Sequence, residues 1–502
     1  MGEMKNPSRR RITIAIMALG GQGGGVLADW IIDMASRENY VAQGTSVPGV
    51  AQRTGATIYY IELFPNADRS PILALSPMPG DVDIIIAAEL MEAGRAILRG
   101  FVDQDRTTLI ASTHRIYAIS EKSAMGDGIA NRDYVLNAAR TRARKFVGFD
   151  MELAADQAGS MISPVLFGAL AASGALPFGR KSFEAAVRDS AIAVEANLKG
   201  FAAGFAGEPD NTAATPSPGL PPPPQTPAGH KLQARIEAEL PNQAWPLAIE
   251  GVRRLLDYQD AAYAELYLDR LGAIAALDVA DLDSVLTRET ARHLALWMSY
   301  EDTIRVADLK TRRSRVARVH EEIRVRPDQV VHVTEFMHPR LQEICETLPA
   351  RAGSLVLRSK AITALLSPLF RKGRHVTSTR LGWFLVLYVI AGLRPWRRGT
   401  LRYRQEQARI EAWLLLACDA AKSDTGAALE LVLSQGLIKG YGDTFARGLR
   451  NFDILQSAYR QFQSRPDCAA ILRRLRDAAL KDEEGHALSA ALAQLGLAVD
   501  AA

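Results

Sequence analysis

The stretch ALGGQGGGVLADW, residues 18–30, joins an apolar run to an amphipathic pattern through five glycines. The apolar run 12–19 is typical of a buried strand. Glycine accepts positive φ angles and lets a ligand approach the main chain closely. A helix that begins after such a turn presents unpaired N–H groups and a positive dipole end. The stretch predicts a strand, a turn and a helix over 24–37, with a phosphate or carboxylate bound at the turn. A tight crossover without a ligand is the alternative interpretation.

Two common nucleotide-binding loops do not fit this turn. In a Rossmann pattern Gly21 and Gly23 would be the first two glycines, but Val26 stands at the third position. The next strand-like run, YVAQG, carries Gln43 where an acidic residue would hold a ribose hydroxyl. No Gly-Lys-Ser/Thr follows, so the turn is not a Walker A loop either.

Strand-like and helical patterns alternate through residues 1–206. Runs rich in apolar and β-branched residues lie at 55–64, 82–88, 106–112 and 145–151, and helical patterns fill the gaps up to 181–205. This alternation indicates an α/β domain in which helices cover both faces of a mostly parallel, doubly wound sheet.

A proline-rich segment separates this domain from the rest of the chain. Residues 207–230 include four consecutive prolines, which favour an extended linker. Residues 231–502 carry apolar residues at three- and four-residue steps, which predicts a mainly α-helical second domain packed as a bundle. Tyr-(Gln/Glu)-Asp occurs there at Tyr258 and Tyr300, an echo that alone is weak evidence for a repeat.

Composition argues against several classes of protein. A net charge of +4 over 502 residues gives no reason to expect nucleic-acid binding. The three cysteines lie far apart without a Cys-x-x-Cys, so we expect no metal or iron–sulfur cluster on this chain and a cytoplasmic location. The apolar run 381–393 is too short to predict a transmembrane segment, and we expect it to form a buried core helix.

Three stretches together resemble the gamma-type domain of the 2-oxoacid:ferredoxin oxidoreductases. They are GGQGGGVLADWI, GTSVPGVAQRTGATIYYIEL and PGDVDIIIAAELMEAGRAI, and they follow the order of that family. In the family a Gly-Gly-Gln-Gly turn precedes a second loop and then a helix with an acidic-Leu start. HRIYAISEKSAMGDG and LLDYQDAAYAELY resemble, more narrowly, the beta subunit of the indolepyruvate ferredoxin oxidoreductases. The gamma-type resemblance covers residues 12–205.

The resemblance implies an oxidoreductase subunit that acts in a complex. The family decarboxylates a 2-oxoacid on thiamine diphosphate with Mg²⁺, passes electrons through [4Fe-4S] clusters to ferredoxin and usually forms an acyl-coenzyme A. Those cofactors would lie on a larger alpha subunit, in an α2β2 hetero-oligomer acting on aryl pyruvates such as indolepyruvate. The Gly-Asp-Gly at 126–128 is interpreted as a polar turn, because the sequence has no Asn-Asn pair to complete a thiamine site. The alternative is a stand-alone nucleotide- or coenzyme A-binding regulatory protein with a helical interaction domain.

The glycine turn and a second loop at 44–55 supply the candidate site. The resemblance implies that this chain can bind coenzyme A, and the predicted contacts are Gly20, Gly21, Gln22, Gly23, Gly24, Thr45, Ser46 and Arg53. Gln22 would add a side-chain amide and Arg53 an anion clamp, with a surface ion pair as the alternative for Arg53. No catalytic residue is predicted. Ser112, Thr113 and His114 follow a strand-like run and are expected to be capping or hydrogen-bonded groups, with ligand binding as the alternative.

One long segment contains no acidic residue. Residues 348–405 hold twelve Lys or Arg and no Asp or Glu. This segregation predicts a docking surface for an acidic partner, either the larger subunit or ferredoxin, in which Arg397, Arg398 and Arg402 take part. A solvated basic face and an anchor on an anionic membrane are the alternatives.

Overall fold

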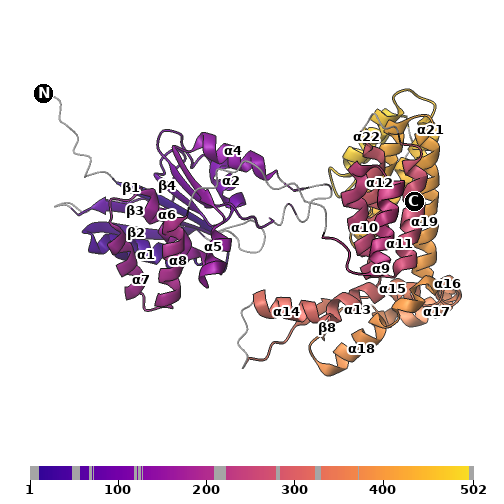
Figure 1. The fold of residues 1–502 in the computed structure, drawn as a ribbon, viewed down its shortest axis with the longest axis horizontal. Helices are drawn as coiled ribbons and strands as arrows, with labels where there is room; N and C mark the ends of the chain where they lie inside the picture. The colour runs from indigo at the N-terminus through magenta and orange to yellow at the C-terminus, as the bar shows by residue number, and fades with distance from the viewer. Residues whose placement is uncertain are drawn as a thin grey trace. The chain divides into compact units, whose positions relative to one another are not determined.

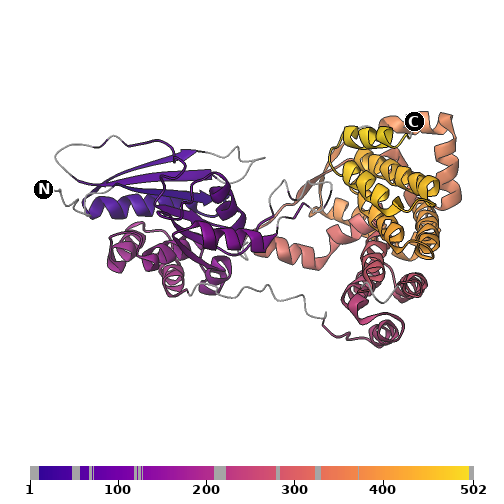
Figure 2. The same ribbon diagram turned by 90° about the horizontal axis from the view of Figure 1, so that it is seen from above.

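The computed structural model divides into two compact units, Met1–Ser217 and Pro218–Ala502. It describes residues 11–47, 57–66, 71, 73–117, 121, 126, 128–129, 131–207, 222–278, 283–322, 329–370 and 372–496. The division between the units falls inside the proline-rich segment. Figures 1 and 2 show the elements of each unit from two directions.

The first unit is built on a six-stranded sheet with the order β2-β3-β1-β4-β5-β6. The strands are β1 (Ile12–Ala18), β2 (Tyr40–Val47), β3 (Thr57–Pro65), β4 (Ile84–Ala87), β5 (Thr108–Ser112) and β6 (Lys145–Phe149). β1, β4, β5 and β6 are mutually parallel, whereas β3 runs antiparallel to both β1 and β2. The prediction of a mostly parallel sheet is confirmed. Because β3 lies between β1 and β2, the adjacent β1–β2 pair of a Rossmann dinucleotide site is absent from this sheet.

Helices cover both faces of the sheet, as predicted. One core contains Ile14 and Ile16 of β1 with residues of α1 (Gly24–Arg37), α5 (Met151–Ala158), α6 (Ile162–Ser173), α7 (Arg180–Asp189) and α8 (Val194–Ala206). The other core contains Ala15 and Met17 with residues of α2 (Leu90–Leu98) and α4 (Arg132–Arg142). Figure 1 shows helices on both faces of the sheet. Because side chains alternate between the two faces along a strand, β1 is buried on both sides, and its sequence is one continuous apolar run.

The second unit is mainly helical, as predicted. Its bundle comprises α9 (Pro227–Glu239), η2 (Asn242–Ala244), α10 (Trp245–Tyr258), α11 (Ala261–Ala275), α12 (Val285–Met298), α19 (Leu401–Ala421), α20 (Thr425–Leu433), η6 (Ser434–Leu437), α21 (Gly442–Phe462), α22 (Cys468–Ala479) and α23 (His486–Gln494). All of these elements except η2 contribute residues to one large apolar core. α9 includes the last four residues of the predicted linker, because Thr226 caps it and Pro227 is compatible with a first helical turn.

A peripheral group of elements interrupts the bundle between α12 and α19. It consists of α13 (Thr303–Thr311), α14 (Arg313–Glu322), β7 (Thr334–Met337), α15 (Leu341–Thr347), α16 (Ala350–Arg358), α17 (Lys360–Leu366), η4 (Ser367–Phe370), β8 (Arg374–Thr377), α18 (Leu381–Ala391) and η5 (Arg394–Gly399). β7 and β8 form a two-stranded antiparallel ribbon that the sequence patterns did not predict. We call α13, α14, α18 and the ribbon the arm (Figure 1).

The expected burial of the 381–393 run is wrong. Of the residues in α18 only Leu387 is buried, whereas Leu381 is 73% exposed and Val389 is 66% exposed. The arm contributes no residue to the bundle core, and α18 packs chiefly against the short α13. A single short neighbour cannot enclose a helix that is apolar all round. Among the described residues, no helix is both long and apolar enough to span a membrane.

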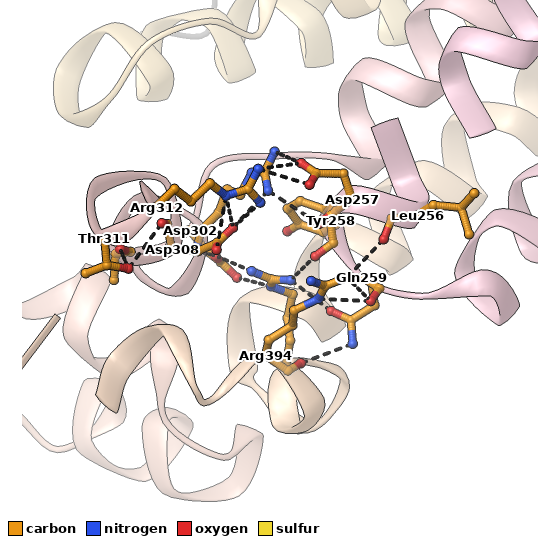
Figure 3. Close-up of polar contacts among 12 residues, drawn as sticks. Leu256, Asp257, Tyr258, Gln259, Asp302, Asp308, Thr311, Arg312 and Arg394 are labelled. Atoms are coloured by element: carbon orange, nitrogen blue, oxygen red, sulfur yellow. Dashed lines mark hydrogen bonds and ion pairs between the residues drawn. The ribbon is translucent and has the colours of Figure 1, made fainter. Parts of the chain in front are cut away.

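The Tyr-(Gln/Glu)-Asp echo marks two equivalent helix junctions. Asp260 accepts a hydrogen bond from the Tyr263 N–H (2.8 Å) and caps α11, and Asp302 accepts one from the Arg305 N–H (2.7 Å) and caps α13. η5 binds both junctions (Figure 3). Arg398 pairs with Asp260 at 2.7 Å and Arg397 pairs with Asp302 at 2.8 Å.

Arg397 is the buried centre of this contact. Its side chain is 1% exposed, and its guanidinium lies 4.1 Å from the ring centroid of Tyr258. It also donates to the Tyr258 carbonyl (2.7 Å) and to Oε1 of Gln259 (2.8 Å).

Arg402 is also paired inside the second unit. It pairs with Glu346 at 2.9 Å and Glu406 at 3.0 Å.

The prediction that Arg397 and Arg402 take part in a docking surface is therefore wrong, because both side chains are largely buried and paired, whereas Arg398 is paired with Asp260 but stays exposed. Their acidic partners lie outside the acid-free segment, so the local charge pattern could not show that these arginines are already paired.

We predict that Arg397→Met will destabilise the second unit by about 3–5 kcal/mol, because it leaves the buried Asp302 carboxylate without its cation. Arg398→Met is the matched control. Both members of its ion pair are 44% exposed, so its loss should cost less than about 1 kcal/mol. Urea unfolding followed by far-UV circular dichroism measures both changes. Equal effects of the two substitutions would contradict a buried Arg397 pair.

Candidate functional site

The glycine turn is closed by a hydrogen-bonded brace between its two ends. The Leu19 N–H donates to Oε1 of Gln22 at 2.7 Å, and the Gln22 N–H donates to the Leu19 carbonyl at 3.2 Å. The Gly23 carbonyl then accepts the first hydrogen bond of α1, from the Leu27 N–H at 3.0 Å. The side-chain oxygen of Gln22 thus supports the turn, which leaves its Nε2 group as the part that can donate to a ligand.

Three glycines in the turn serve different purposes. A methyl group at Gly24 would lie 2.6 Å from the Tyr59 ring, and one at Gly23 would lie 2.6 Å from Oγ of Ser163. These two positions allow close packing of α1 against the sheet and α6. Gly21 has a φ of +91°, yet no atom lies within 4 Å of where its methyl group would be. Gly21 therefore combines a backbone conformation that favours glycine with open space for a ligand.

The N-terminus of α1 has no side-chain cap. Gly23 occupies the capping position in the left-handed conformation, and the first turn contains no acidic residue. The amide donors of that turn keep their positive partial charge, which suits a phosphate or carboxylate oxygen.

The turn lies where the winding of the sheet changes direction. β1 leads into α1 on one face, and its parallel neighbour β4 leads into α2 on the opposite face. Ligands of open α/β sheets bind at the carboxyl ends of strands at such a position. The topology thus places the uncapped start of α1 at the preferred binding edge of the sheet.

Glu89 occupies the equivalent position at the start of α2. Its carboxylate accepts hydrogen bonds from the Met91 N–H (2.9 Å) and the Glu92 N–H (2.8 Å). Burial raises the pKa of Glu89 to about 7, and the nearby Glu92 contributes in the same direction. The two helix starts at the switch point therefore differ: a carboxyl group fills one and the other is open. A Glu directly after the apolar run 82–88 indicates the capped start of a helix. The sequence analysis used this Glu only as part of the family motif and did not predict its capping role.

The last residue of β5 and the residues that follow it form a hydrogen-bonded group. Oγ of Ser112 lies 2.6 Å from Nδ1 of His114 and accepts from the Met151 N–H at 3.0 Å, at the first residue of α5. Burial lowers the pKa of His114, opposed by the charge of Asp150. The Thr113 N–H donates to the Phe149 carbonyl at 2.9 Å. These contacts tie the ends of β5 and β6 together, which agrees with the expected capping and structural roles.

The predicted second loop differs from the structure in its first part. Residues 44–47 belong to β2, because β2 pairs with β3 along its whole length. Ser46 is opposite Tyr59, whose ring contacts α1, but two strand spacings, about 10 Å, separate β2 from β1. Thr45 is opposite Tyr60, on the other face, and donates to the Leu75 carbonyl at 2.6 Å. The structure brings Gly20, Gly21, Gln22, Gly23 and Gly24 together, with Ser46 on the same face and Thr45 on the opposite one.

Two other predicted features lie outside the described residues. Arg53 is one of them, together with the rest of the predicted loop, residues 48–55. Asp127, the centre of the Gly-Asp-Gly stretch, is the other. Within the part of the chain that the structure describes, no group of three or more His, Cys, Asp and Glu side chains could hold a metal ion.

Comparison with known proteins separates the chain at the same linker. Residues 13–207 match the family model of pyruvate ferredoxin/flavodoxin oxidoreductase, and residues 245–458 match DUF6537, a family of unknown function. The indolepyruvate oxidoreductase subunit IorB of Archaeoglobus fulgidus is 25% identical over 199 residues, which are 39% of this chain and 94% of the relative.

Two solved structures are similar to the first unit. The pyruvate oxidoreductase subunit PORC of Thermotoga maritima is 15% identical, with 39% of this chain and 96% of that chain covered and a TM-score of 0.28. The gamma subunit of a keto/oxoacid ferredoxin oxidoreductase of Geobacter sulfurreducens is 19% identical, with 39% and 95% covered and a TM-score of 0.27.

The raised pKa of Glu89 predicts that the stability of the protein depends on pH. This folded-state pKa of about 7 lies above the ordinary value of 4.5, so the folded protein holds a proton that the unfolded chain has released. This contribution to stability is complete below about pH 4.5 and is lost as the pH rises through about 7, by up to about 3 kcal/mol. Glu89→Gln keeps an oxygen that can cap α2 and should remove that loss.

Urea-unfolding midpoints across this pH range measure the effect. Glu195→Gln on α8 is the matched control, because the Glu195 side chain is 87% exposed and should leave the profile unchanged. A Glu89→Gln profile that parallels the wild type would contradict the raised pKa.

Proposed function

We propose that this chain is the smaller subunit of an indolepyruvate-type enzyme, because residues 13–207 match the family model of pyruvate ferredoxin/flavodoxin oxidoreductase and are similar to an indolepyruvate oxidoreductase subunit. The complex oxidatively decarboxylates an aryl pyruvate and passes the electrons to ferredoxin or a similar acceptor. The larger alpha subunit holds thiamine diphosphate, Mg²⁺ and the [4Fe-4S] clusters, in an α2β2 assembly. The reducing cytoplasm suits three cysteines that are all free.

The role that we propose for this chain within the complex depends on the glycine turn. The residues that make up the Gly-Gly-Gln-Gly signature also form an uncapped helix start at the switch point of the sheet. We propose that this turn binds a phosphate of coenzyme A. Backbone amides of the first turn of α1 donate to the phosphate oxygens, and Gln22 Nε2 adds a side-chain donor.

Charge and space at the turn favour such a ligand. Nothing lies within 4 Å of the place where a side chain at Gly21 would begin, so an oxygen can approach the main chain there, and the φ of +91° favours glycine. The carboxyl of Glu89 is held partly protonated by burial, which lowers its repulsion of an incoming anion. Ser46 would extend the contact on the α1 face, and we propose that Arg53 adds an anion clamp, whereas Thr45 supports the sheet from the other side.

The larger subunit's thiamine diphosphate would supply the carbanion chemistry of decarboxylation when bound. The role of this chain is to hold the acyl acceptor by its phosphates, so that the reactive end of the acceptor is presented to the partner's active site.

We expect the isolated chain to contain no stoichiometric cluster iron and to show no arylpyruvate oxidation. Coexpression with the larger chain should yield a brown complex that oxidises arylpyruvate with coenzyme A and ferredoxin. Iron, labile sulfide and turnover measured on both preparations test this. Stoichiometric cluster iron on the isolated chain, or turnover by it, would contradict the proposal. A colourless monomer that binds nucleotide by itself would support the regulatory alternative.

Within the assembled complex, we expect Gly21→Val to raise the KM for coenzyme A at least about tenfold, equivalent to about 1.4 kcal/mol of lost binding. The substitution strains the turn and places a branched side chain in the space proposed for the phosphate.

Gly174→Val controls for strain alone. Gly174 ends α6 with a φ of +66° and open space around it, in the same unit. An equal rise in KM for both variants would show that backbone strain, rather than loss of a phosphate contact, explains the effect.

A further inference from the structure

The outer face of α18 is an exposed apolar surface in the arm. Leu381, Leu385, Tyr388 and Val389 follow the spacing of one helical stripe, and Val386 lies beside them. Their exposed fractions range from 47% at Val386 to 73% at Leu381. We call these five residues the α18 face. Such a concentration of large apolar side chains is unusual on a free surface and marks a contact site.

The opposite side of α18 is already occupied. Leu387 is buried, and α13 packs against the helix. Trp383 and Phe384 are half-buried. The helix sequence LGWFLVLYVIA contains no charged residue that could solvate the outer face. The face therefore remains uncovered within the described residues of the second unit, and a covering partner must supply apolar side chains.

Two exposed cations precede α18 in the chain, and one of them, Arg380, is the N-cap residue of the helix. Lys372 and Arg380 are exposed in the segment that leads into α18, and neither forms an ion pair with a described residue. In contrast, the cations after the helix are held internally: Arg394 donates to the Gln259 carbonyl at 2.9 Å, and Arg397 pairs with Asp302. Asp308 and Glu335 of the arm are already paired with Arg312 and Arg315. A partner for this face gains from carboxylates at its edge.

These features distinguish among three kinds of occupant. A second copy of this chain would bring like charges together, which opposes association. An interfacial membrane helix has a charged face opposite its apolar one, whereas the side of α18 opposite the face is packed on α13. A protein surface with an apolar centre and an acidic rim would cover the α18 face and pair with the exposed cations, as in stable protein–protein interfaces.

We propose that the α18 face is the docking surface for the larger subunit, which presents an apolar groove bordered by Asp and Glu side chains. This inference rests on the proposed function, because that function supplies the partner. It assigns a role in assembly to the arm, while the glycine turn of the first unit binds the ligand.

The test uses the full-length chain and the coexpressed larger chain of the same organism. Leu385→Ser with Val389→Ser should weaken the dissociation constant of the two chains at least tenfold. Lys372→Glu with Arg380→Glu should weaken it similarly and reduce its dependence on salt. Leu415→Ser is the matched control, because Leu415 is 69% exposed on α19 in the bundle, and its affinity should equal the wild type. Circular dichroism and thermal melting establish that each variant is folded.

The other occupants are outcomes of the same experiment. Unchanged affinity of the folded Leu385→Ser, Val389→Ser variant for the larger chain overturns the proposal. So does a loss, in that variant, of binding to phosphatidylserine vesicles or of self-association while affinity for the larger chain is retained. If the wild-type chains do not associate at all, the proposed function fails together with the docking surface. If they associate and the variants do so equally, only the docking surface fails.

Discussion

The first turn of α1 packs so closely on the sheet that no side chain fits at Gly24. A methyl group there would be 2.6 Å from the Tyr59 ring and 2.8 Å from Cβ of Ala18. This contact fixes the start of α1 over the end of β1, so the chain must reverse within residues 19–23. This short connection needs the left-handed backbone of Gly23 and the hydrogen bond of Gln22, and it leaves the backbone at Gly21 open. Because β1 lies at the switch point, the same constraint presents the uncapped helix start to a ligand.

The second unit depends on a different kind of contact. Its two Tyr-x-Asp junctions are far apart in sequence, and η5 holds them together through Arg397 and Arg398. The buried pair of Arg397 and Asp302 contributes specificity, since neither charge could stay buried without the other. The arm extends from this junction and leaves α18 covered on one side only. A rigid junction that carries an exposed apolar helix is suited to assembly, whereas the first unit is suited to binding a small anion.

The sequence predicted the features of the fold that local pattern determines. The apolar and β-branched runs located β1, β3, β4, β5 and β6, and the glycine turn with the amphipathic pattern gave the bounds of α1. Features set by distant partners were missed. Thr45 and Ser46 belong to β2 because they pair with residues of β3. Arg397 can be buried because it pairs with Asp302, which lies 95 positions earlier in the sequence. The exposure of α18 could not be predicted either, because burial depends on what surrounds a helix rather than on its composition. In the candidate site, the turn glycines were identified, but the buried Glu89 was not recognised as a titrating neighbour.

Hydrogen exchange in the assembled complex tests the central claim most directly. The amides of the glycine turn and the first turn of α1 should become protected when coenzyme A is added, because they donate to its phosphate. The amides around Gly174, at the end of α6, should exchange at an unchanged rate. Protection confined to the turn would support the account. Exchange at the turn that coenzyme A does not alter, in a complex that still turns over with it, would contradict it.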